Sequence, residues 1–487
     1  MASAPHPDCA RASDGSGALR RWRTRLEPAA ILGAALVVGA WLRFANLGTP
    51  DLSADEAASW AAASAQNVAE VLQRQAGLNP GELGVHDLLL HAWIRLFGDG
   101  LSTMRALSAV VATLAIPLVF LLVRAILTLA DSAMDAPLPS DESADTTPIA
   151  AVAALLFAVN LVTIKYAREA RMYPVALVLT LAQICCFLRA LRSGGLLNQG
   201  LTALFTALAV ASTYSTGLIL VPEGLYLGLT LLRTRHRVAT IMRLGTALVL
   251  GTIAVVPLYF FEHHRGAAPN LQTWDWIKPP APWAFISLFN KGTGTYGFPL
   301  LAILAAAGAI RGWAQWRNGI TLLLLWMFAP PVLLIIASYL FHPAFVERYV
   351  LSCFVPFFAL AAIGLARLEP ASMRPAAGAL VVVISLAHVV AWGRKPHGDG
   401  WADATTVAAR HLSPAESIGV APHYAKAVVS YYLRANPTAP RVEASNASPP
   451  PTVIIVADSF DKPEAVSLLR QYPRVLGHPQ GLTVRGR

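Results

Sequence analysis

The sequence predicts an α-helical polytopic membrane protein with a small α/β domain at its C-terminal end. The first observation is composition: 55% of the 487 residues are hydrophobic and only 14% are charged, against about 25% charged residues in soluble domains. The second is the recurrence of apolar windows of about 18 residues or more, each long enough to cross a membrane as a helix. The third is a change of composition near residue 393, after which short apolar and amphipathic runs alternate.

About eleven membrane-spanning helices are expected. Barrel strands are excluded because they would alternate polar and apolar residues over about ten positions. The expected spans cover 28–46, 102–128, 148–163, 173–191, 200–214, 217–232, 244–261, 298–310, 319–341, 350–366 and 375–392. Arginines gather before the first span and in alternate loops, so the N-terminus is predicted to be cytoplasmic. An odd number of spans then places the C-terminal domain outside the cell's inner (plasma) membrane.

Three regions follow along the chain. Residues 1–27 are expected as a cytoplasmic tail, 28–392 as the transmembrane domain and 393–487 as an extracytoplasmic α/β domain with a parallel sheet. Residues 47–100 hold amphipathic segments that are too polar to cross, so helices at the outer interface are predicted, with Trp60 and Trp93 as anchors. The last region is expected to hold helices near 402–411, 424–434 and 462–471, and strands near 417–421, 453–457 and 482–485.

The net charge of +10 fits cytoplasmic anchoring residues and anionic lipid better than nucleic acid. No basic run carries the interleaved aromatic residues that would favour nucleic-acid binding. The four cysteines form no spaced framework, and Cys185 and Cys186 are adjacent in an apolar run. Neither disulfide bonds nor a cysteine zinc site is therefore expected.

An acidic cluster follows the first span, where the chain leaves the membrane. Asp51, Asp55 and Glu56 place three carboxylates within six residues. A carboxylate that accepts the proton of an attacking hydroxyl group speeds the reaction by about 10² to 10⁴. A solvated loop that only ends the first helix is the simpler interpretation. Asp55 and Glu56 are the candidate catalytic residues.

Four basic residues break the positive-inside trend, because their short loops are expected outside. They are Lys165, Arg168, Arg171 and Arg348. An anionic ligand explains them, since guanidinium groups bind phosphate oxygens in a bidentate manner, and snorkelling toward lipid headgroups is the alternative. Glu169 lies between two of the arginines. A carboxylate near a phosphate needs a basic neighbour or a divalent cation to offset repulsion, so an arginine screen and a metal ion both stay open.

Histidine offers another route to a metal ion. His86 lies in the first outer loop beside Asp87, and a zinc or manganese site could combine it with acids such as Glu169. Neither HxH nor HxxxH spacing is present, so an ordinary histidine at the interface is the simpler interpretation. His86 and Glu169 are the candidate metal ligands.

Several short motifs, taken in order, resemble the polytopic GT-C glycosyltransferases. They are the Asp55-Glu56 pair after the first span, Leu96-Phe97-Gly98-Asp99, Arg105-Ala106-Leu107-Ser108, the stretch 167–173, and Glu347-Arg348-Tyr349-Val350-Leu351. The closest branch is that of the protein O-mannosyltransferases and the bacterial aminoarabinose transferase to lipid A. The resemblance covers most of residues 28–367. Members often carry His-Pro-Pro-Leu or Pro-Pro-Leu-Tyr in the first loop, whereas this chain has Val85-His86-Asp87-Leu88-Leu89.

The resemblance implies transfer of a sugar from a polyprenyl-phosphate donor to a glycan, lipid or protein acceptor at the outer face, in the cell envelope. It implies that Asp55 is the general base, that Glu56 supports it, and that Glu169 lies near the donor phosphate or a metal ion. Basic groups fixed at the leaving phosphate would lower the barrier. The residues expected to bind this phosphate are Lys165, Arg168, Arg171, Tyr173 and Arg348.

Two other classes of protein stay open. A transporter or flippase of a lipid-linked or anionic substrate also needs many spans, but it should place ionisable residues near mid-membrane. A non-catalytic membrane scaffold would use the C-terminal domain to bind a partner. The charged residues selected above lie at the outer boundary, which favours the enzyme.

Overall fold

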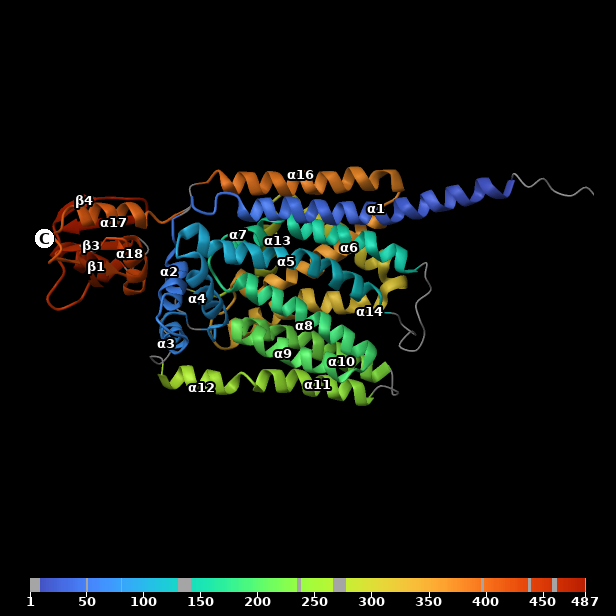
Figure 1. Ribbon diagram of the computed structural model, residues 1–487, viewed down its shortest axis with the longest axis horizontal. Helices are drawn as coiled ribbons and strands as arrows, with labels where there is room; N and C mark the ends of the chain where they lie inside the picture. Colours follow the sequence, from blue (N-terminus) through green and yellow to red (C-terminus); the bar gives the residue numbers. More distant parts are fainter. Residues whose placement is uncertain are drawn as a thin grey trace, which may run out of the picture.

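A computed structural model describes residues 9–49, 51–79, 81–129, 142–233, 238–265, 277–395, 398–436, 439–457 and 462–486. Long helices run side by side in an elongated bundle, and a small domain with a sheet lies at one end (Figure 1). The helices of the bundle are α1 (Cys9–Phe44), α5 (Leu101–Leu127), α6 (Glu142–Ala158), α7 (Leu161–Ala167), α8 (Tyr173–Ser193), α9 (Leu196–Ser212), α10 (Leu220–Arg233), α11 (Val238–Ile253), α12 (Val256–Arg265), α13 (Ala284–Thr293), α14 (Gly297–Leu340), α15 (Phe354–Ala366) and α16 (Arg374–Gly393). Short 3-10 turns η1 (Tyr214–Ile219), η4 (Glu347–Cys353) and η5 (Ala371–Met373) connect them.

The predicted class, a helical polytopic membrane protein, is confirmed. Among the described residues, eight helices are long and apolar enough to cross a membrane, or nine if the bent pair of α6 and α7 is one span. This is fewer than the eleven expected. One difference is α9, which has 17 residues and is shorter than a full span. Another is α14, whose 44 residues count as one helix although they include both ranges expected at 298–310 and 319–341 and are interrupted between them at Trp316. The N-terminal helix α1 also begins inside the predicted tail, at Cys9, although its apolar span begins only at Glu27.

The long helix α14 is interrupted at Trp316, where the backbone leaves helical geometry. Before the break, Gly308 packs so closely on Gly364 of α15 that a Cβ on either glycine would collide with a backbone carbonyl of the other helix. At the break, Trp316 lies under the guanidinium of Arg367, just beyond the end of α15. Trp326, ten residues later, lies back at the start of α15. The chain therefore reverses direction along α15, and small residues permit the close approach, as is common between membrane helices.

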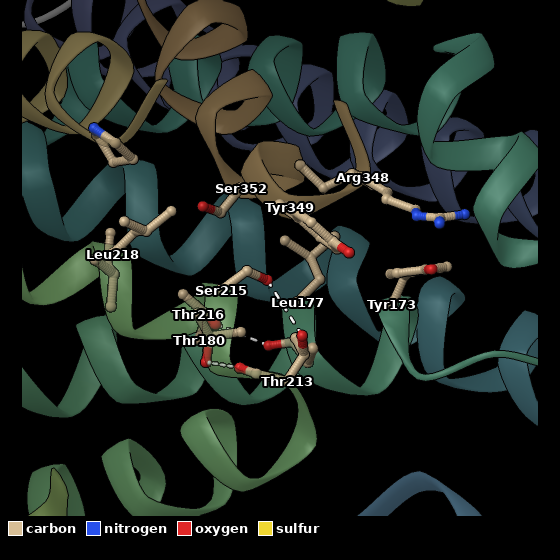
Figure 2. A pocket seen from close by; sticks show the side chains of 14 residues that line it. Tyr173, Leu177, Thr180, Thr213, Ser215, Thr216, Leu218, Arg348, Tyr349 and Ser352 are labelled. Atoms are coloured by element: carbon tan, nitrogen blue, oxygen red, sulfur yellow. Dashed lines mark hydrogen bonds between the residues drawn. The ribbon is translucent and has the colours of Figure 1, made fainter. Parts of the chain in front are cut away.

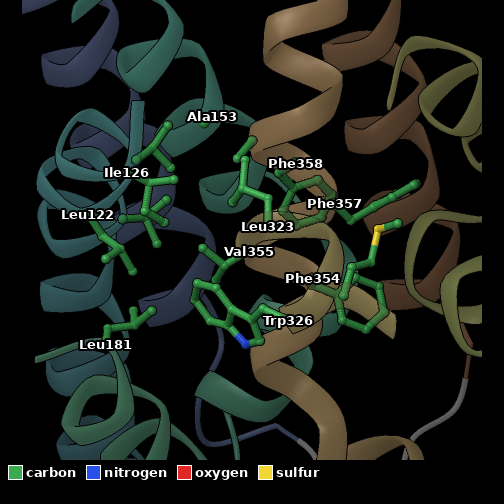
Figure 3. Close-up of a cluster of buried hydrophobic side chains, with 14 of the residues drawn as sticks. Leu122, Ile126, Ala153, Leu181, Leu323, Trp326, Phe354, Val355, Phe357 and Phe358 are labelled. Carbon is green, nitrogen blue, oxygen red and sulfur yellow. The ribbon is translucent and has the colours of Figure 1, made fainter. Parts of the chain in front are cut away.

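The core of the bundle lies around α15, which is buried along nearly its whole length. Phe354, Phe357 and Phe358 of this helix pack among aliphatic side chains of α5, α6, α8 and α14, with Trp326 beside them (Figure 3). The indole Nε1 of Trp326 donates a hydrogen bond to Ser352 Oγ at 3.3 Å. These contacts fix the start of α15 and, with it, the preceding turn η4 that contains Arg348.

The bent pair α6 and α7 meets at an angle of 58°. A break inside a membrane leaves backbone groups without partners, and these must be satisfied within the protein. Arg43 of α1, which is fully buried, donates to the carbonyl of Ala158 at 2.9 Å and to Thr163 Oγ1 at 3.1 Å. Asn160 caps α7 through the N–H of Val162 at 3.0 Å. The break is therefore built into the fold, and it directs α7 toward the charged loop 168–172.

Three short helices lie between the bundle and the C-terminal domain (Figure 1): α2 (Ala54–Ala63), α3 (Val68–Leu78) and α4 (Val85–Phe97). They occupy the range for which interfacial helices were predicted. The two predicted anchors have protein partners: Trp93 Nε1 donates to the carbonyl of Thr103 at 2.8 Å, and Trp60 Nε1 donates to Asp99 Oδ2 at 3.1 Å. These contacts thus hold α4 and α2 against the start of α5, at the end of the bundle.

The C-terminal domain carries a five-stranded sheet in the order β2-β1-β3-β5-β4. Its elements are α17 (Trp401–Arg410), β1 (Ser417–Ala421), η6 (His423–Ala425), α18 (Lys426–Leu433), β2 (Arg441–Ala444), β3 (Val453–Ala457), α19 (Lys462–Gln471), β4 (Arg474–Gly477) and β5 (Leu482–Gly486). The prediction of a parallel sheet is only partly right, because β1 pairs in parallel with β2 and β3 but β5 is antiparallel to both β3 and β4. A parallel crossover needs about a dozen residues, and the short turn from β4 to β5 leaves room only for a hairpin.

Candidate active site

The acidic cluster leads into α2, and the local sequence explains how the helix begins. Ser53 is the N-cap: its Oγ accepts the N–H of Glu56 at 3.3 Å, and Glu56 Oε2 accepts the N–H of Ser53 at 3.1 Å. This reciprocal capping box needs a serine and, three residues later, a glutamate. It orients the two neighbouring acids differently, because Glu56 is buried and Asp55 is exposed.

Glu56 forms an ion pair with Arg105 of α5 inside the protein. Its Oε1 accepts Arg105 Nε at 2.7 Å and its Oε2 accepts Arg105 Nη2 at 2.8 Å, with 2% and 3% of the two side chains exposed. The N–H of Ala170 donates to the same Oε1 at 2.9 Å, and Arg105 also donates to the carbonyls of Leu47 and Asp51. A buried ion pair is tolerated when its remaining groups are satisfied in this way. Glu56 therefore links α2, α5 and the loop 168–172.

Asp55 lies on the open side of the same helix, with 55% of its side chain exposed. Its Oδ2 is 3.2 Å from Nη1 of Arg348, which belongs to a segment 293 residues away in the sequence. Its backbone carbonyl accepts Arg171 Nη1 at 2.9 Å. The structure thus joins two of the predicted site residues directly and holds the backbone of Asp55 through a third.

Arg171 turns inward, away from the open side. It is 6% exposed, and its Nη1 donates to Ser59 Oγ at 3.0 Å and Asn79 Oδ1 at 2.7 Å, besides the carbonyl of Asp55. Its Nη2 lies 3.7 Å from Glu82 Oε1. These contacts tie the loop 168–172 to α2 and to the segment between α3 and α4.

Lys165, Arg168 and Glu169, at the end of α7 and in the loop 168–172, lie nearer the surface. Lys165 Nζ is 3.9 Å from Glu347 Oε1 and sits over the ring of Tyr166. Arg168 donates to the carbonyl of Asn46 at 3.2 Å and stacks over Trp392. Glu169 is partly buried. Burial, followed by the charges of Glu56 and Asp55, raises the pKa of Glu169 to about 7, so its carboxyl group exchanges a proton near neutral pH.

A pocket lies behind Arg348, between α8, η1, α14 and η4. It holds about 420 Å³ of empty space, part of which is open to solvent. Arg348 and Tyr173 stand on one side, and the hydroxyl groups of Thr180, Thr213 and Ser215 gather on another (Figure 2). The remaining lining is largely apolar, from α8, η1 and α14. The Arg348 guanidinium lies 5.9 Å from the ring centre of Tyr173, so the predicted Tyr173 shares the site.

The predicted metal ligands do not assemble into a cluster. His86 is fully buried, with its Nδ1 3.4 Å from Asp87 Oδ1. Among the described residues, no group of three or more His, Cys, Asp or Glu side chains is placed to hold a metal ion. The donor set therefore does not fit a site made by the protein alone, and a role for a metal ion stays a prediction.

The residues that sequence reasoning missed are mainly the fixed polar partners. Asn79 and Glu82 hold Arg171, and Tyr432 of α18 binds the acidic cluster from the C-terminal domain. Only one such feature left a local signal, the capping box at Ser53, because a serine and a glutamate three residues apart before an apolar run are recognisable. Contacts between residues far apart in the sequence leave no comparable pattern.

These features define the class by fold: a bundle of membrane helices with an acidic helix terminus at one end, a basic residue that contacts it and lines a pocket, and a mixed α/β domain beyond. No protein-family model matches the sequence, and no curated protein sequence matches it. Solved structures do match.

ArnT from Cupriavidus metallidurans in the apo state superposes with a TM-score of 0.60 at 14% identity, over 96% of this chain and 98% of that chain. The same protein bound to undecaprenyl phosphate gives 0.58 at 12% identity, over 94% and 97%. The archaeal oligosaccharyltransferase AglB from Archaeoglobus fulgidus, in complex with an inhibitory peptide and a dolichol-phosphate, gives 0.54 at 11% identity, over 92% and 71%. The chain therefore has the fold of GT-C membrane glycosyltransferases, as the motifs predicted.

Proposed function

We propose that this protein transfers a sugar from a polyprenyl-phosphate donor to an acceptor hydroxyl group at the outer face of the membrane, with the N-terminus cytoplasmic and the C-terminal domain outside. One observation carries the proposal: the exposed carboxylate of Asp55 faces Arg348 at a pocket between membrane helices. The bound lipid phosphates of the ArnT and AglB structures, which share the fold, support the class of donor.

Arg348 and its neighbours would bind the donor phosphate. A guanidinium binds phosphate in a bidentate manner more strongly than it holds a single carboxylate oxygen at an exposed position. Donor binding would then draw Arg348 away from Asp55 and leave that carboxylate free for the acceptor. Lys165 and Arg168 add positive charge at the end of α7. The hydroxyl-lined and apolar walls of the pocket would face the sugar and the start of the lipid.

The reaction needs a base and a stabilised leaving group. Asp55 would accept the proton of the acceptor hydroxyl while its oxygen forms a bond to the anomeric carbon of the sugar. The bond between that carbon and the phosphate oxygen breaks, and the lipid phosphate leaves with the electron pair. Arg348 stabilises the charge that develops there. No step in this scheme passes through a metal ion.

Glu56 and Arg171 serve this scheme as positioning residues. The Glu56 carboxylate is occupied by Arg105, Ser53 and the N–H of Ala170, so its contribution is to fix the helix that presents Asp55. Arg171 fixes the carbonyl of Asp55 itself. Glu56 was predicted to support Asp55, and its contacts agree with that role, whereas Arg171 was predicted to bind the donor phosphate and its contacts favour a positioning role instead.

One observation favours the transport alternative. Glu223 lies in the middle of the span Tyr214–Arg233, is 1% exposed, and accepts a hydrogen bond from Gln183 Nε2 at 3.0 Å. A buried ionisable residue at this depth is typical of substrate and proton pathways. Movement of a lipid-linked donor across the membrane without sugar transfer would support this second function.

The test is sugar transfer from a panel of polyprenyl-phosphate sugars by the full protein in reconstituted membranes. Asp55→Asn should lower transfer by at least about a hundredfold while the protein stays folded, because the amide cannot accept the proton. Asp403→Asn is the matched control, since Asp403 is also an exposed acid in the first turn of a helix, α17. Equal transfer by wild type and Asp55→Asn would remove Asp55 from the mechanism.

A further inference from the structure

The C-terminal domain contacts the acidic cluster itself. Helix α18 packs on α2, and the hydroxyl oxygen of Tyr432 accepts the backbone N–H of Leu52 at 2.8 Å. Leu52 is fully buried in a cluster that combines Trp401 and Ala404 of the domain with Ala57 of α2. A buried N–H that loses its acceptor is costly, so Tyr432 constrains the backbone three residues before Asp55.

The residue before Leu52 is bound by the same domain. The carboxylate of Asp51 lies at the N-terminus of α17, where burial raises its pKa and the nearby backbone N–H of Ala402 partly offsets that rise. A carboxylate at a helix N-terminus satisfies an N–H group that has no partner inside the helix. The approach is close, since a Cβ on Gly398 would come within 3.1 Å of Asp51 Cβ. Asp51, the first acid of the cluster, thus lies against the N-terminus of a helix of the C-terminal domain.

A third contact closes the other end of α2. Asp99 Oδ2 accepts Arg434 Nε at 2.8 Å and Trp60 Nε1 at 3.1 Å, and the carbonyl of Asp99 accepts the hydroxyl of Tyr431 at 3.2 Å. Trp60 also meets Tyr431 edge to face, with ring centres 5.2 Å apart. The domain therefore holds α2 before its first turn and near its last turn, and Asp55 lies between these two contacts.

We propose that the C-terminal domain is a part of the active site that positions Asp55, and that Tyr432 is its main positioning residue. This inference rests on the proposed function for its effect on rate, but the contact itself can be tested without activity. The hydroxyl of Tyr432 acts at the backbone of the loop, so its loss should change the geometry of the base rather than the binding of the donor. Small misplacements of a catalytic group cost large factors in rate.

The experiment compares Tyr432→Phe with Tyr472→Phe in the full protein. Tyr472 is a matched control, because it is a buried tyrosine of the same domain whose hydroxyl donates to the carbonyl of Pro451 at 2.8 Å, away from α2. Tyr432→Phe should lower kcat by about tenfold with little change in the KM for the donor. Tyr472→Phe should leave both near wild type. Equal loss in the two variants would reduce Tyr432 to a structural residue of its domain and overturn the proposal.

Two further measurements separate this proposal from the proposed function. Amide hydrogen exchange at residues 51–56 should rise in Tyr432→Phe and not in Tyr472→Phe, whether or not sugar transfer is observed. Unchanged exchange overturns the positioning role. In an enzyme that uses Asp55, Tyr432→Phe should add little to the loss in Asp55→Asn, because both act on the same group. Full additivity of the two losses would show that Tyr432 acts elsewhere and would also overturn the proposal.

Discussion

Helix α2 begins with two adjacent acids, Asp55 and Glu56, whose surroundings differ. Glu56 lies on the buried side of the helix and Asp55 on the exposed, open side. On the buried side, Glu56 is enclosed by Arg105, Ser53 and Ala170, and Ser59 is held by Arg171. On the open side, Asp55 contacts the guanidinium of Arg348, and 55% of its side chain is exposed. The same chemical group is therefore a fixed structural link on one side and an exposed carboxylate on the other, where we propose that it acts as the base. The difference comes from burial and from the number of donors, not from residue type.

Substitution on the buried side should give the largest effect on stability. Glu56→Gln removes the charge that balances Arg105, which stays buried, and breaking one partner of a buried ion pair costs about 3–5 kcal/mol. The apparent melting temperature of the full protein in detergent should fall clearly. Glu70→Gln is the matched control, because Glu70 is a partly exposed acid in the first turn of α3 that pairs with Arg74, and it should melt close to wild type. Similar melting of both variants would contradict the buried role of Glu56.

The sequence predicted those features that depend on local composition. Hydropathy located the membrane helices because each span must be apolar along its own length. The antiparallel strand β5 depends on tertiary pairing and connection length, so the prediction of a parallel sheet was only partly right. Separate spans were predicted on the two sides of Trp316, where α14 is interrupted.

The candidate site shows the same division between features with a local signal and features that depend on distant contacts. Asp55 and Arg348 were selected because both are charged where the chain leaves a span, and the structure brings them together. The pairing of Glu56 with Arg105, and of Arg171 with Asn79, joins residues 49 and 92 positions apart. Nothing local distinguishes such an arginine, held inside, from one that faces a ligand. The roles of Glu56 and Arg171 therefore needed the fold.

On the open side, Arg348 should affect transfer more than stability. Arg348→Lys keeps the charge but loses the planar fork that binds two phosphate oxygens, so we expect transfer about tenfold lower, with a raised KM for the donor. Arg348→Gln also loses the charge at the leaving phosphate, and we expect transfer about a hundredfold lower. Steady-state kinetics with varied donor concentration measure both. If the lysine variant matches wild type, a single positive charge is sufficient and bidentate binding is wrong.

The smallest expected effect is that of substituting Glu169, and it depends on pH. Its pKa is raised to about 7 from an ordinary value of 4.5, so between these values the folded protein keeps a proton that the unfolded chain has lost. Stability from this group is therefore complete below about pH 4.5 and is lost as pH rises toward 7. Glu169→Gln resembles the protonated form at every pH. It should melt like wild type near pH 5 and be more stable at pH 8, on the order of 1 kcal/mol because water screens the partly exposed carboxylate. Melting temperatures measured from pH 5 to 8 test this. A constant difference between the two proteins would show that Glu169 does not titrate in this range and would contradict the raised pKa.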